Sequence, residues 1–292
     1  MRNMMLLINP FSGRGVTKHA IGNIISQLCH GGYAVTAFFV GEDSPEQLAY
    51  EHAKNYEALV CVGGDGTLSS VFSGIIRSGA DVPVGYIPAG TANDMAATHS
   101  LSKIHAYAIK TILNGESRKL DIGLFSGRYF AYIAAFGAFT SVSYLTSRNA
   151  KRALGHFAYV LGGVAEATAV KAVHTIVEHD GGVIEGDFLF GGVTNSTSVA
   201  GFLKLDPDSV ALDDGLFEVV LIKQPLNPAD MIDILAGLAK HTYDGENVQL
   251  LHSSNVRFRF EEDVAWTIDG EEGGSHREAE ITNCHRAVNL IV

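Results

Sequence analysis

The stretch Leu59-Val60-Cys61-Val62-Gly63-Gly64-Asp65-Gly66-Thr67 is a short apolar run that ends directly in a glycine-rich loop. A helical pattern follows it from Leu68 to Ile76. Because glycine has no Cβ, the backbone N–H groups of such a loop can approach phosphate oxygens, and a helix beginning at Leu68 would direct its positive end at them. The stretch therefore predicts a strand, a phosphate-binding turn and a helix; the alternative is an ordinary strand-to-helix turn without a ligand. It matches neither the dinucleotide-binding fingerprint nor the Walker A loop, so neither mechanism is transferred to it.

The neighbouring segments repeat this alternation of strand and helix. Apolar runs at Met4–Ile8, Ala34–Val40 and Val82–Ile87 predict strands. Apolar residues recur at helical spacing between 21 and 28, and Ser44-Pro45-Glu46-Gln47 has the cap, first-turn proline and capping-box glutamine that begin a second helix. Strands that alternate with helices predict βαβ units and a parallel sheet, which binds ligands at the carboxyl ends of its strands.

From about Asp121 the pattern changes to strands joined mostly by turns. Two helical patches, at 156–172 and 228–241, interrupt them. The predicted strands cover residues 128–136, 173–179, 183–193, 216–222, 255–260, 265–268 and 287–292. The predicted fold is therefore α/β: a Rossmann-like parallel-sheet domain over residues 1–122, then a β-sandwich-rich domain over 123–292, whose last strand is a candidate to return to the first domain.

Composition excludes several classes of protein. The chain has 292 residues, which is enough for two domains with their own cores. Its composition, with 47% hydrophobic and 18% charged residues, excludes a disordered protein. Its 32 acidic and 21 basic residues, a formal charge of −11, argue against nucleic-acid binding. The three cysteines are unclustered, so neither a disulfide framework nor a zinc site is expected. With no apolar run long enough for a bilayer span and no signal-peptide pattern, the expected location is cytoplasmic.

Three polar, glycine-bearing loops follow predicted strands of the parallel sheet. They are residues 9–15, 63–67 and 88–94. In a parallel sheet the carboxyl ends of strands share one edge, so these loops are expected to lie together. They would supply backbone donors, hydroxyls and carboxylates, the groups that bind a nucleotide and its metal ion, although a coincidence of turns remains the alternative. The side chains concerned are Ser12, Thr67 and Thr91 with Asp65 and Asp94.

In their order and spacing, six motifs resemble the soluble bacterial diacylglycerol kinases, relatives of the sphingosine and ceramide kinases. The motifs are Asn9-Pro10-Phe11-Ser12-Gly13, Gly63–Thr67, Pro88–Asp94, Asp121-Ile122-Gly123, Leu212–Phe217 and Ile268-Asp269-Gly270-Glu271. They extend over nearly the whole chain. The Gly63–Thr67 motif alone also occurs in NAD kinases and is similar to a phosphofructokinase loop, so it does not identify the substrate.

The resemblance implies a lipid kinase that transfers the γ-phosphoryl group of ATP, with Mg²⁺, to a lipid hydroxyl across a nucleotide cleft between the two domains. Diacylglycerol, giving phosphatidate, is the implied acceptor. By motif, the implied nucleotide-binding residues are Asn9, Pro10, Ser12, Gly13, Gly63, Gly64, Asp65, Gly66, Thr67, Thr91, Asn93 and Asp94. Asp65 would organise the catalytic Mg²⁺, and Glu271 would be the general base. Asp214 would bind a structural Mg²⁺ with backbone carbonyls near Ala211 and Leu216.

For two of these segments the residues alone favour simpler interpretations. Asp269–Gly274 also fits an acidic surface turn, and Asp213-Asp214-Gly215 an ordinary hairpin turn. Segment 148–172 is a candidate for peripheral membrane contact, with a core helix as its alternative. Its apolar residues Phe157, Tyr159, Val160 and Leu161 are bounded by Lys151 and Arg152 before and by Lys171 after.

Three other functions stay open: an NAD kinase-like phosphotransferase, a non-catalytic nucleotide- or lipid-binding regulator, and, more distantly, a phosphofructokinase-type activity. A homodimer is a further candidate.

Overall fold

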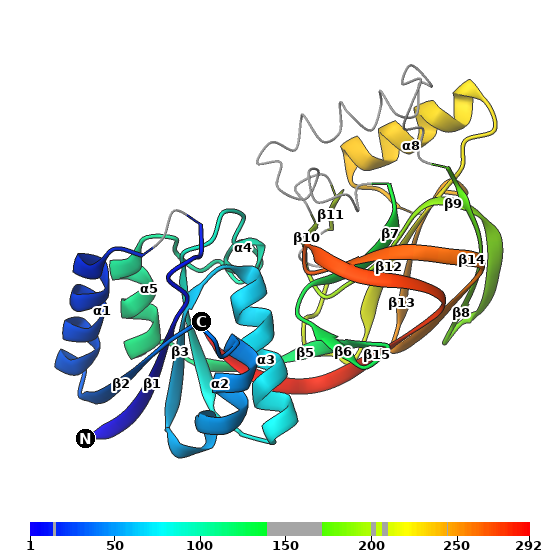
Figure 1. Cartoon of the computed structure of the whole chain (residues 1–292). Helices are drawn as coiled ribbons and strands as arrows, with labels where there is room; N and C mark the ends of the chain where they lie inside the picture. The colour runs from blue at the N-terminus through cyan, green and yellow to red at the C-terminus, as the bar shows by residue number, and fades with distance from the viewer. Residues whose placement is uncertain (14–15, 139–170, 200–202, 206–209, 244) are drawn as a thin grey trace. The chain divides into compact units, whose positions relative to one another are not determined.

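The computed structural model describes residues 1–13, 16–138, 171–199, 203–205, 210–243 and 245–292 (Figure 1). The chain forms two compact units, residues 1–122 with 285–292, and residues 123–284. Strand β5 (Ser117–Phe125) carries the chain out of the first unit, and strand β15 (Glu271–Ile291) carries it back. The candidate membrane segment 148–172 lies outside the described residues except for its last two.

The first unit contains a parallel sheet. Its order is β2-β1-β3-β4, and the end of β15 pairs in parallel with β4 through Asn289 and Leu290. The predicted strands of this unit are confirmed within a residue or two. Their observed bounds are β1 Arg2–Ile8, β2 Tyr33–Phe39, β3 Ala58–Gly63 and β4 Pro83–Pro88.

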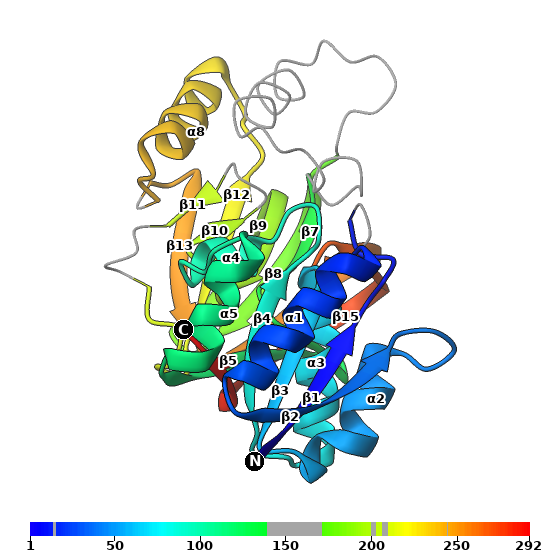
Figure 2. The same ribbon diagram turned by 90° about the vertical axis from the view of Figure 1, so that its left-hand side faces the viewer.

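Helices cover both faces of this sheet. Helices α1 and α5 lie on one side, and α2 and α3 on the other (Figures 1 and 2). The core under α1 and α5 contains Ile24, Leu28 and Ile109 packed on alternate residues of β1 and β3. Burying an aliphatic side chain of this size contributes about 1.5–3 kcal/mol. The helices are α1 Lys18–His30, α2 Pro45–His52, the 3₁₀ turn Ala53–Asn55, α3 Asp65–Ser78, α4 Asp94–Thr98 and α5 His105–Asn114.

The ends of these helices follow from local chemistry. Ser44 accepts a hydrogen bond from the Gln47 N–H at 3.1 Å, so the predicted N-cap of α2 is confirmed. Gly79 ends α3 in the left-handed region, with φ 67°. The sequence analysis missed helix α5, because its N-cap residue is Ile104, whose side chain cannot accept a hydrogen bond from the first turn.

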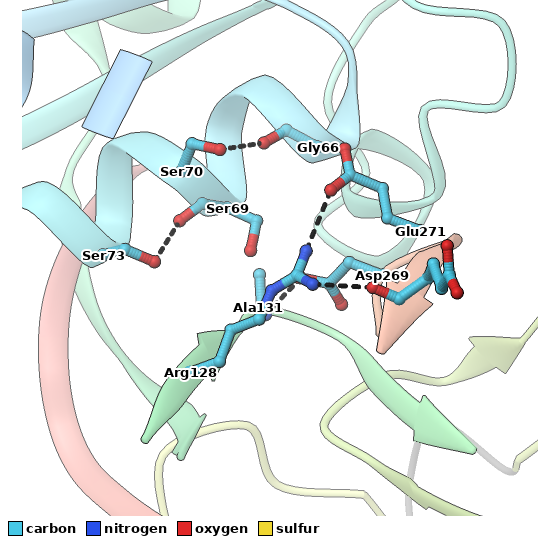
Figure 3. Close-up of polar contacts among 9 residues, drawn as sticks. Gly66, Ser69, Ser70, Ser73, Arg128, Ala131, Asp269 and Glu271 are labelled. Carbon is cyan, nitrogen blue, oxygen red and sulfur yellow. Dashed lines mark hydrogen bonds and ion pairs between the residues drawn. The ribbon is translucent and has the colours of Figure 1, made fainter. Parts of the chain in front are cut away.

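The predicted start of α3 at Leu68 is wrong, because the helix begins at Asp65. The Leu68 N–H already donates to the Gly64 carbonyl at 3.1 Å, and the Ser70 hydroxyl donates to the Gly66 carbonyl at 2.9 Å (Figure 3). Asp65 therefore lies in the first turn, where a carboxylate is stabilised by the positive end of the helix dipole.

The second unit is built mainly from antiparallel strands. Strand β9 pairs with β7 along one part of its length and with β8 along another. Strand β14 also pairs with both β7 and β8, so the four strands form a closed cycle of hydrogen-bonded neighbours. Trp266 packs against Phe125, Phe136 and Phe258 in the core of the unit. The remaining strand bounds are β6 Arg128–Phe130, β7 Ile133–Gly137, β8 Val173–His179, β9 Gly182–Thr194, β10 Ser198–Val199, β11 Leu203–Lys204, β12 Phe217–Lys223, β13 Val248–Ser253 and β14 Asn255–Ile268.

Four predicted strands need correction, three in this unit and one in the part of β15 that returns to the first unit. The predicted strand 128–136 is two strands, because the N–H groups of Ala131 and Tyr132 donate to the Asp269 carboxylate. The predicted strands 255–260 and 265–268 form one strand, β14, whose pairing with β15 shifts register between Arg259 and Val264. The predicted strand 287–292 is only the end of β15, which begins at Glu271.

The predicted helix 228–241 is confirmed as α8, Pro228–Lys240. Asn227 caps it by accepting the N–H groups of Ala229 and Asp230, and His241 ends it with φ 59°. Among the described helices, none combines the length and the apolar character that crossing a membrane requires.

Candidate functional site

The three loops of the sequence prediction, described over residues 9–13, 63–67 and 88–94, lie together in the first unit. They follow β1, β3 and β4, which are adjacent in the parallel sheet. The Ala89 N–H donates to the Gly63 carbonyl at 2.7 Å, and the Asn9 N–H donates to the Val62 carbonyl at 2.9 Å. Backbone contacts therefore join the third loop to the start of the second, and the first loop to the end of β3, as the parallel sheet predicts.

Three glycines allow these loops to pack backbone against backbone. A Cβ on Gly90 would lie 2.5 Å from the Gly64 Cα, and one on Gly13 would lie 2.4 Å from the Ala89 oxygen. Gly13 also has φ 59°, which side-chain-bearing residues rarely adopt. The packing of the loops themselves therefore requires these glycines.

Side chains of the first loop hydrogen bond with the second. Asn9 Nδ2 donates to Thr67 Oγ1 at 2.9 Å, and the Gly64 N–H donates to Ser12 Oγ at 3.3 Å. Ser12 Oγ also lies 3.4 Å from Thr67 Oγ1. A cluster of hydroxyl and amide groups therefore surrounds the N-terminal turn of α3, next to Pro10.

Asp65 connects α3 to α4. Its side chain is buried, its Oδ2 accepts the Asp94 N–H at 3.0 Å, and its Oδ1 accepts the Met95 N–H at 3.1 Å. Burial raises the pKa of Asp65, although these backbone donors act in the opposite direction. Burial, together with the charge of Asp65, raises the pKa of Asp94 to about 6. A bound cation would stabilise the ionised form of both carboxylates.

Lys103 is a basic residue beside this pair that the sequence analysis missed. Its positive charge opposes the rise in pKa of both Asp65 and Asp94. Its ammonium group donates to the Ala92 carbonyl at 2.8 Å, which places it at the third loop. A single lysine between Ser102 and Ile104 carries no motif, so only the folded chain reveals it.

The third loop is held in place mainly by Asn93. Its Oδ1 accepts the Gly90 N–H at 2.9 Å and its Nδ2 donates to the Gly90 carbonyl at 3.0 Å, with Asn93 itself at φ 55°. Tyr86 lies 3.4 Å from the same Oδ1 through its hydroxyl. Asn93 is buried and shapes the loop, whereas Thr91 is exposed.

The Glu271 turn in the second unit is a two-residue hairpin between β14 and β15. Its central residues, Asp269 and Gly270, have φ 49° and 84°, the positive values that a type I′ turn requires. Glu271 is 62% exposed, whereas Asp269 is buried. The turn therefore exposes Glu271 to solvent but buries Asp269, so it is not an acidic surface turn over its whole length.

The Asp269 carboxylate accepts three backbone N–H groups. They belong to Ala131 (2.7 Å), Tyr132 (3.0 Å) and Ile133 (3.0 Å), so the hairpin turn is fastened to the link between β6 and β7. Arg128, also missed from the sequence, contacts the same turn: its Nη2 lies 2.9 Å from Glu271 Oε2 (Figure 3). Each of these contacts joins residues more than a hundred positions apart, which no local pattern indicates.

Asp214 lies in an exposed turn before β12. Its Oδ1 accepts the Leu216 N–H at 2.9 Å, and Gly215 has φ 85°. The hairpin-turn alternative is wrong, because β12 pairs with β13 and β9 and not with the preceding strand β11. Ala211, Asp214 and Leu216 share this turn, but no cluster of three acidic, histidine or cysteine residues occurs in the described part of the chain.

Comparison with known proteins shows the family. The model of the diacylglycerol kinase catalytic domain matches residues 3–125, and that of the YegS C-terminal NAD kinase beta sandwich-like domain matches residues 134–291. Curated diacylglycerol kinases of Staphylococcus aureus strains JH9 and Newman are each 34% identical over 295 residues, which cover 98% of this chain and 91% of theirs.

Solved structures show the same fold at lower identity. Two crystal structures from Bacillus anthracis strain Sterne, one of them described as a diacylglycerol kinase, each cover 99% of this chain and 96% of their own. Their TM-scores are 0.81 and 0.72 at 19% and 17% identity, respectively. With its catalytic-domain match, its β-sandwich-like second domain and its curated relatives, the chain belongs to the diacylglycerol kinase family of lipid kinases.

Proposed function

We propose that the protein transfers the γ-phosphoryl group of ATP to a lipid hydroxyl, with diacylglycerol as the acceptor and phosphatidate as the product. The observation that carries the proposal is the meeting of three loops around the first turn of α3, with Asp65 buried between them. The names of the curated relatives support the choice of acceptor.

The donor nucleotide would bind at these loops. Phosphoryl transfer depends mainly on positioning and on neutralising phosphate charge. Backbone N–H groups at the start of α3 suit phosphate oxygens, since a helix N-terminus attracts anions. We assign nucleotide contacts to Asn9, Pro10, Ser12, Gly13, Gly63, Gly64, Asp65, Gly66, Thr67 and Thr91, with Asn93 and Asp94 completing the third loop.

The residues at Asp65 fit a magnesium ion. The carboxylate of Asp65 accepts the N–H groups of Asp94 and Met95, with a further backbone contact from Asn93. A carboxylate has about four acceptor positions, so one remains for a metal. Mg²⁺ commonly takes one or two carboxylates together with substrate phosphates and water. Bound there, it would offset the negative charge of the transferred phosphate. Asp214, with carbonyls of Ala211 and Leu216, offers oxygen ligands for a second, structural ion.

Glu271 is the proposed general base. As the acceptor hydroxyl oxygen forms its bond to the γ-phosphorus, the bond between that phosphorus and the β,γ-bridging oxygen breaks and ADP leaves. The Glu271 carboxylate takes the hydroxyl proton. This role requires Glu271 and the donor phosphates to act on the same acceptor molecule. The acceptor lipid would lie in a membrane, and the enzyme, which we expect to be cytoplasmic, would contact the membrane surface transiently.

A second candidate function is phosphorylation of NAD. It is favoured by the match of residues 134–291 to a domain described as NAD kinase beta sandwich-like. One experiment separates the two: the protein is incubated with γ-labelled ATP, Mg²⁺ and either NAD or mixed micelles of single lipids, and the product is identified by mass. Labelled phosphatidate supports the proposal, whereas labelled NADP, or no labelled lipid across a panel of diacylglycerol, sphingoid and polyprenyl alcohols, contradicts it.

A further inference from the structure

One arginine contacts two consecutive residues of the Glu271 turn. Arg128 Nη2 donates to Glu271 Oε2 at 2.9 Å, and its Nη1 donates to the Glu272 carbonyl at 2.8 Å (Figure 3). A planar guanidinium forms such double contacts with less loss of freedom than a lysine would. Because one contact is to the carboxylate and the other to the backbone, Arg128 restricts where the Glu271 side chain can lie relative to its own turn.

We infer that Arg128 is a positioning residue of the kinase reaction, which orients the Glu271 carboxylate for proton transfer. The inference rests on the proposed function, because Arg128 would act only through the proposed base. With Oε2 bound to the guanidinium, Oε1 is the oxygen directed to the acceptor hydroxyl. A base gains its effect only when it lies within hydrogen-bond reach of the proton it takes, so a wandering side chain would be a poor base.

Stability alone does not account for this contact. Arg128 is 46% exposed and Glu271 62% exposed, and exposed ion pairs contribute only about 0–1 kcal/mol. The backbone of the turn is already held from the buried side, where Asp269 accepts three N–H groups. What Arg128 adds to this anchored turn is the orientation of the Glu271 side chain.

A double-mutant cycle in the full-length protein tests the inference. The variants are Arg128→Gln, Arg128→Lys, Glu271→Gln and the pair Arg128→Gln with Glu271→Gln, assayed with γ-labelled ATP, Mg²⁺ and diacylglycerol in mixed micelles. The matched control is Arg259→Gln, because Arg259 forms a similar ion pair with Glu178 (2.7 Å, side chains 44% and 34% exposed) on β14 and β8.

Arg128→Gln should lower kcat about 10- to 100-fold, the cost of a misplaced catalytic group. The KM for ATP should stay within about twofold, because no substrate contact is lost. Glu271→Gln should lower kcat about 10²- to 10⁴-fold. When Glu271 is already glutamine, adding Arg128→Gln should change kcat by less than about twofold, because the effects of substituting two residues that act as a unit are not additive. Arg128→Lys should recover part of the loss, and Arg259→Gln should resemble the wild type.

Three results would overturn the inference while leaving the proposed function intact. The two substitutions could lower kcat multiplicatively, Arg128→Gln could raise the KM for ATP as strongly as it lowers kcat, or Arg259→Gln could be as damaging as Arg128→Gln. A KM for ATP raised as strongly as kcat is lowered would mean that Arg128 contacts the donor phosphates and does not act through Glu271. Failure of the proposed function looks different: wild-type turnover in Glu271→Gln, or no phosphorylated lipid from the wild-type protein.

Discussion

The Oδ2 atom of Asp65 lies 3.0 Å from the backbone nitrogen of Asp94, so the second loop of the candidate site directly holds the first turn of α4. The neighbouring N–H of Met95 donates to the other carboxylate oxygen. This side chain therefore joins the loops, and we propose that it also binds the metal ion. Substitutions that separate these roles are the most informative.

Asp65→Asn should abolish activity with a limited loss of stability. An asparagine keeps one acceptor oxygen but turns an amide toward the other N–H group, so the free energy of unfolding should fall by about 1–3 kcal/mol. Kinase turnover should fall at least about 100-fold, because the charge that would bind Mg²⁺ is gone. Chemical denaturation and turnover are measured beside Asp43→Asn, an exposed acid outside the site. Near-normal turnover of Asp65→Asn would remove Asp65 from the metal site.

Gly90→Ala should destabilise the first unit. The new Cβ would lie 2.5 Å from the Gly64 Cα, and backbone cannot move aside as a flexible side chain can. We expect a loss of about 1–3 kcal/mol and a raised KM for ATP. The matched control is Gly22→Ala on α1, where a Cβ meets nothing within 4 Å.

In that control, alanine should stabilise the helix by about 0.5–1 kcal/mol. Thermal unfolding of both variants provides the comparison. If they shift Tm in the same direction, the close approach of the second and third loops is not a constraint.

Asp269→Ala should destabilise the second unit. Three backbone N–H groups would lose their carboxylate acceptor, and each buried unpaired donor costs about 1–3 kcal/mol, less where water enters. We expect a loss of about 3 kcal/mol in urea denaturation. Asp269→Asn should cost less, because asparagine keeps an acceptor oxygen and tolerates the positive φ of 49°. Equal losses for the two variants would mean that the three N–H groups need the charged carboxylate, and that the acceptor oxygen kept by asparagine is not sufficient.

Asp214→Ala tests the proposed structural ion. In the wild type, millimolar Mg²⁺ should raise Tm, because an ion that binds only the folded chain stabilises it by mass action. EDTA should reverse the effect. In Asp214→Ala, the part of the Mg²⁺-dependent rise in Tm that is due to this turn should disappear. Asp213→Asn keeps Asp214 and serves as the control. An unchanged Mg²⁺ response in Asp214→Ala would mean that no ion binds this turn.

His99 should make stability depend on pH below neutrality. Burial, with a smaller effect from the positive charge of Arg118, lowers the pKa of His99 to about 4. The unfolded chain then binds a proton more readily, so stability is complete above about pH 6.5 and falls as the pH drops toward 4.

Because His99 is only partly buried, we expect the wild type to lose about 1 kcal/mol more than His99→Gln between pH 7 and pH 5. Urea denaturation at both pH values measures this difference. Parallel losses in the two proteins would contradict the assignment to His99.

The accuracy of the sequence predictions followed the range of the interactions involved. Strands of the first unit and the cap of α2 were predicted correctly, because apolar periodicity and capping are encoded within a few residues. The predicted start of helix α3 is three residues late, because Gly64 and Gly66 interrupt the apolar pattern by which a helix is identified. Strand 128–136 was drawn as continuous because nothing nearby signals that Asp269 would take its N–H groups.

By itself, the amino-acid sequence determined the strand-and-helix order of the first unit as far as β4, the glycine loops at the ends of β1, β3 and β4, and the family motifs. Local backbone preferences and the order of residues suffice for these. Only the tertiary structure decided which side chains meet: Asp65 with Met95 across 30 positions, and Arg128 with Glu271 across 143. Such contacts depend on how strands pair and loops pack, and a carboxylate in a sequence does not specify which distant N–H or guanidinium it will bind.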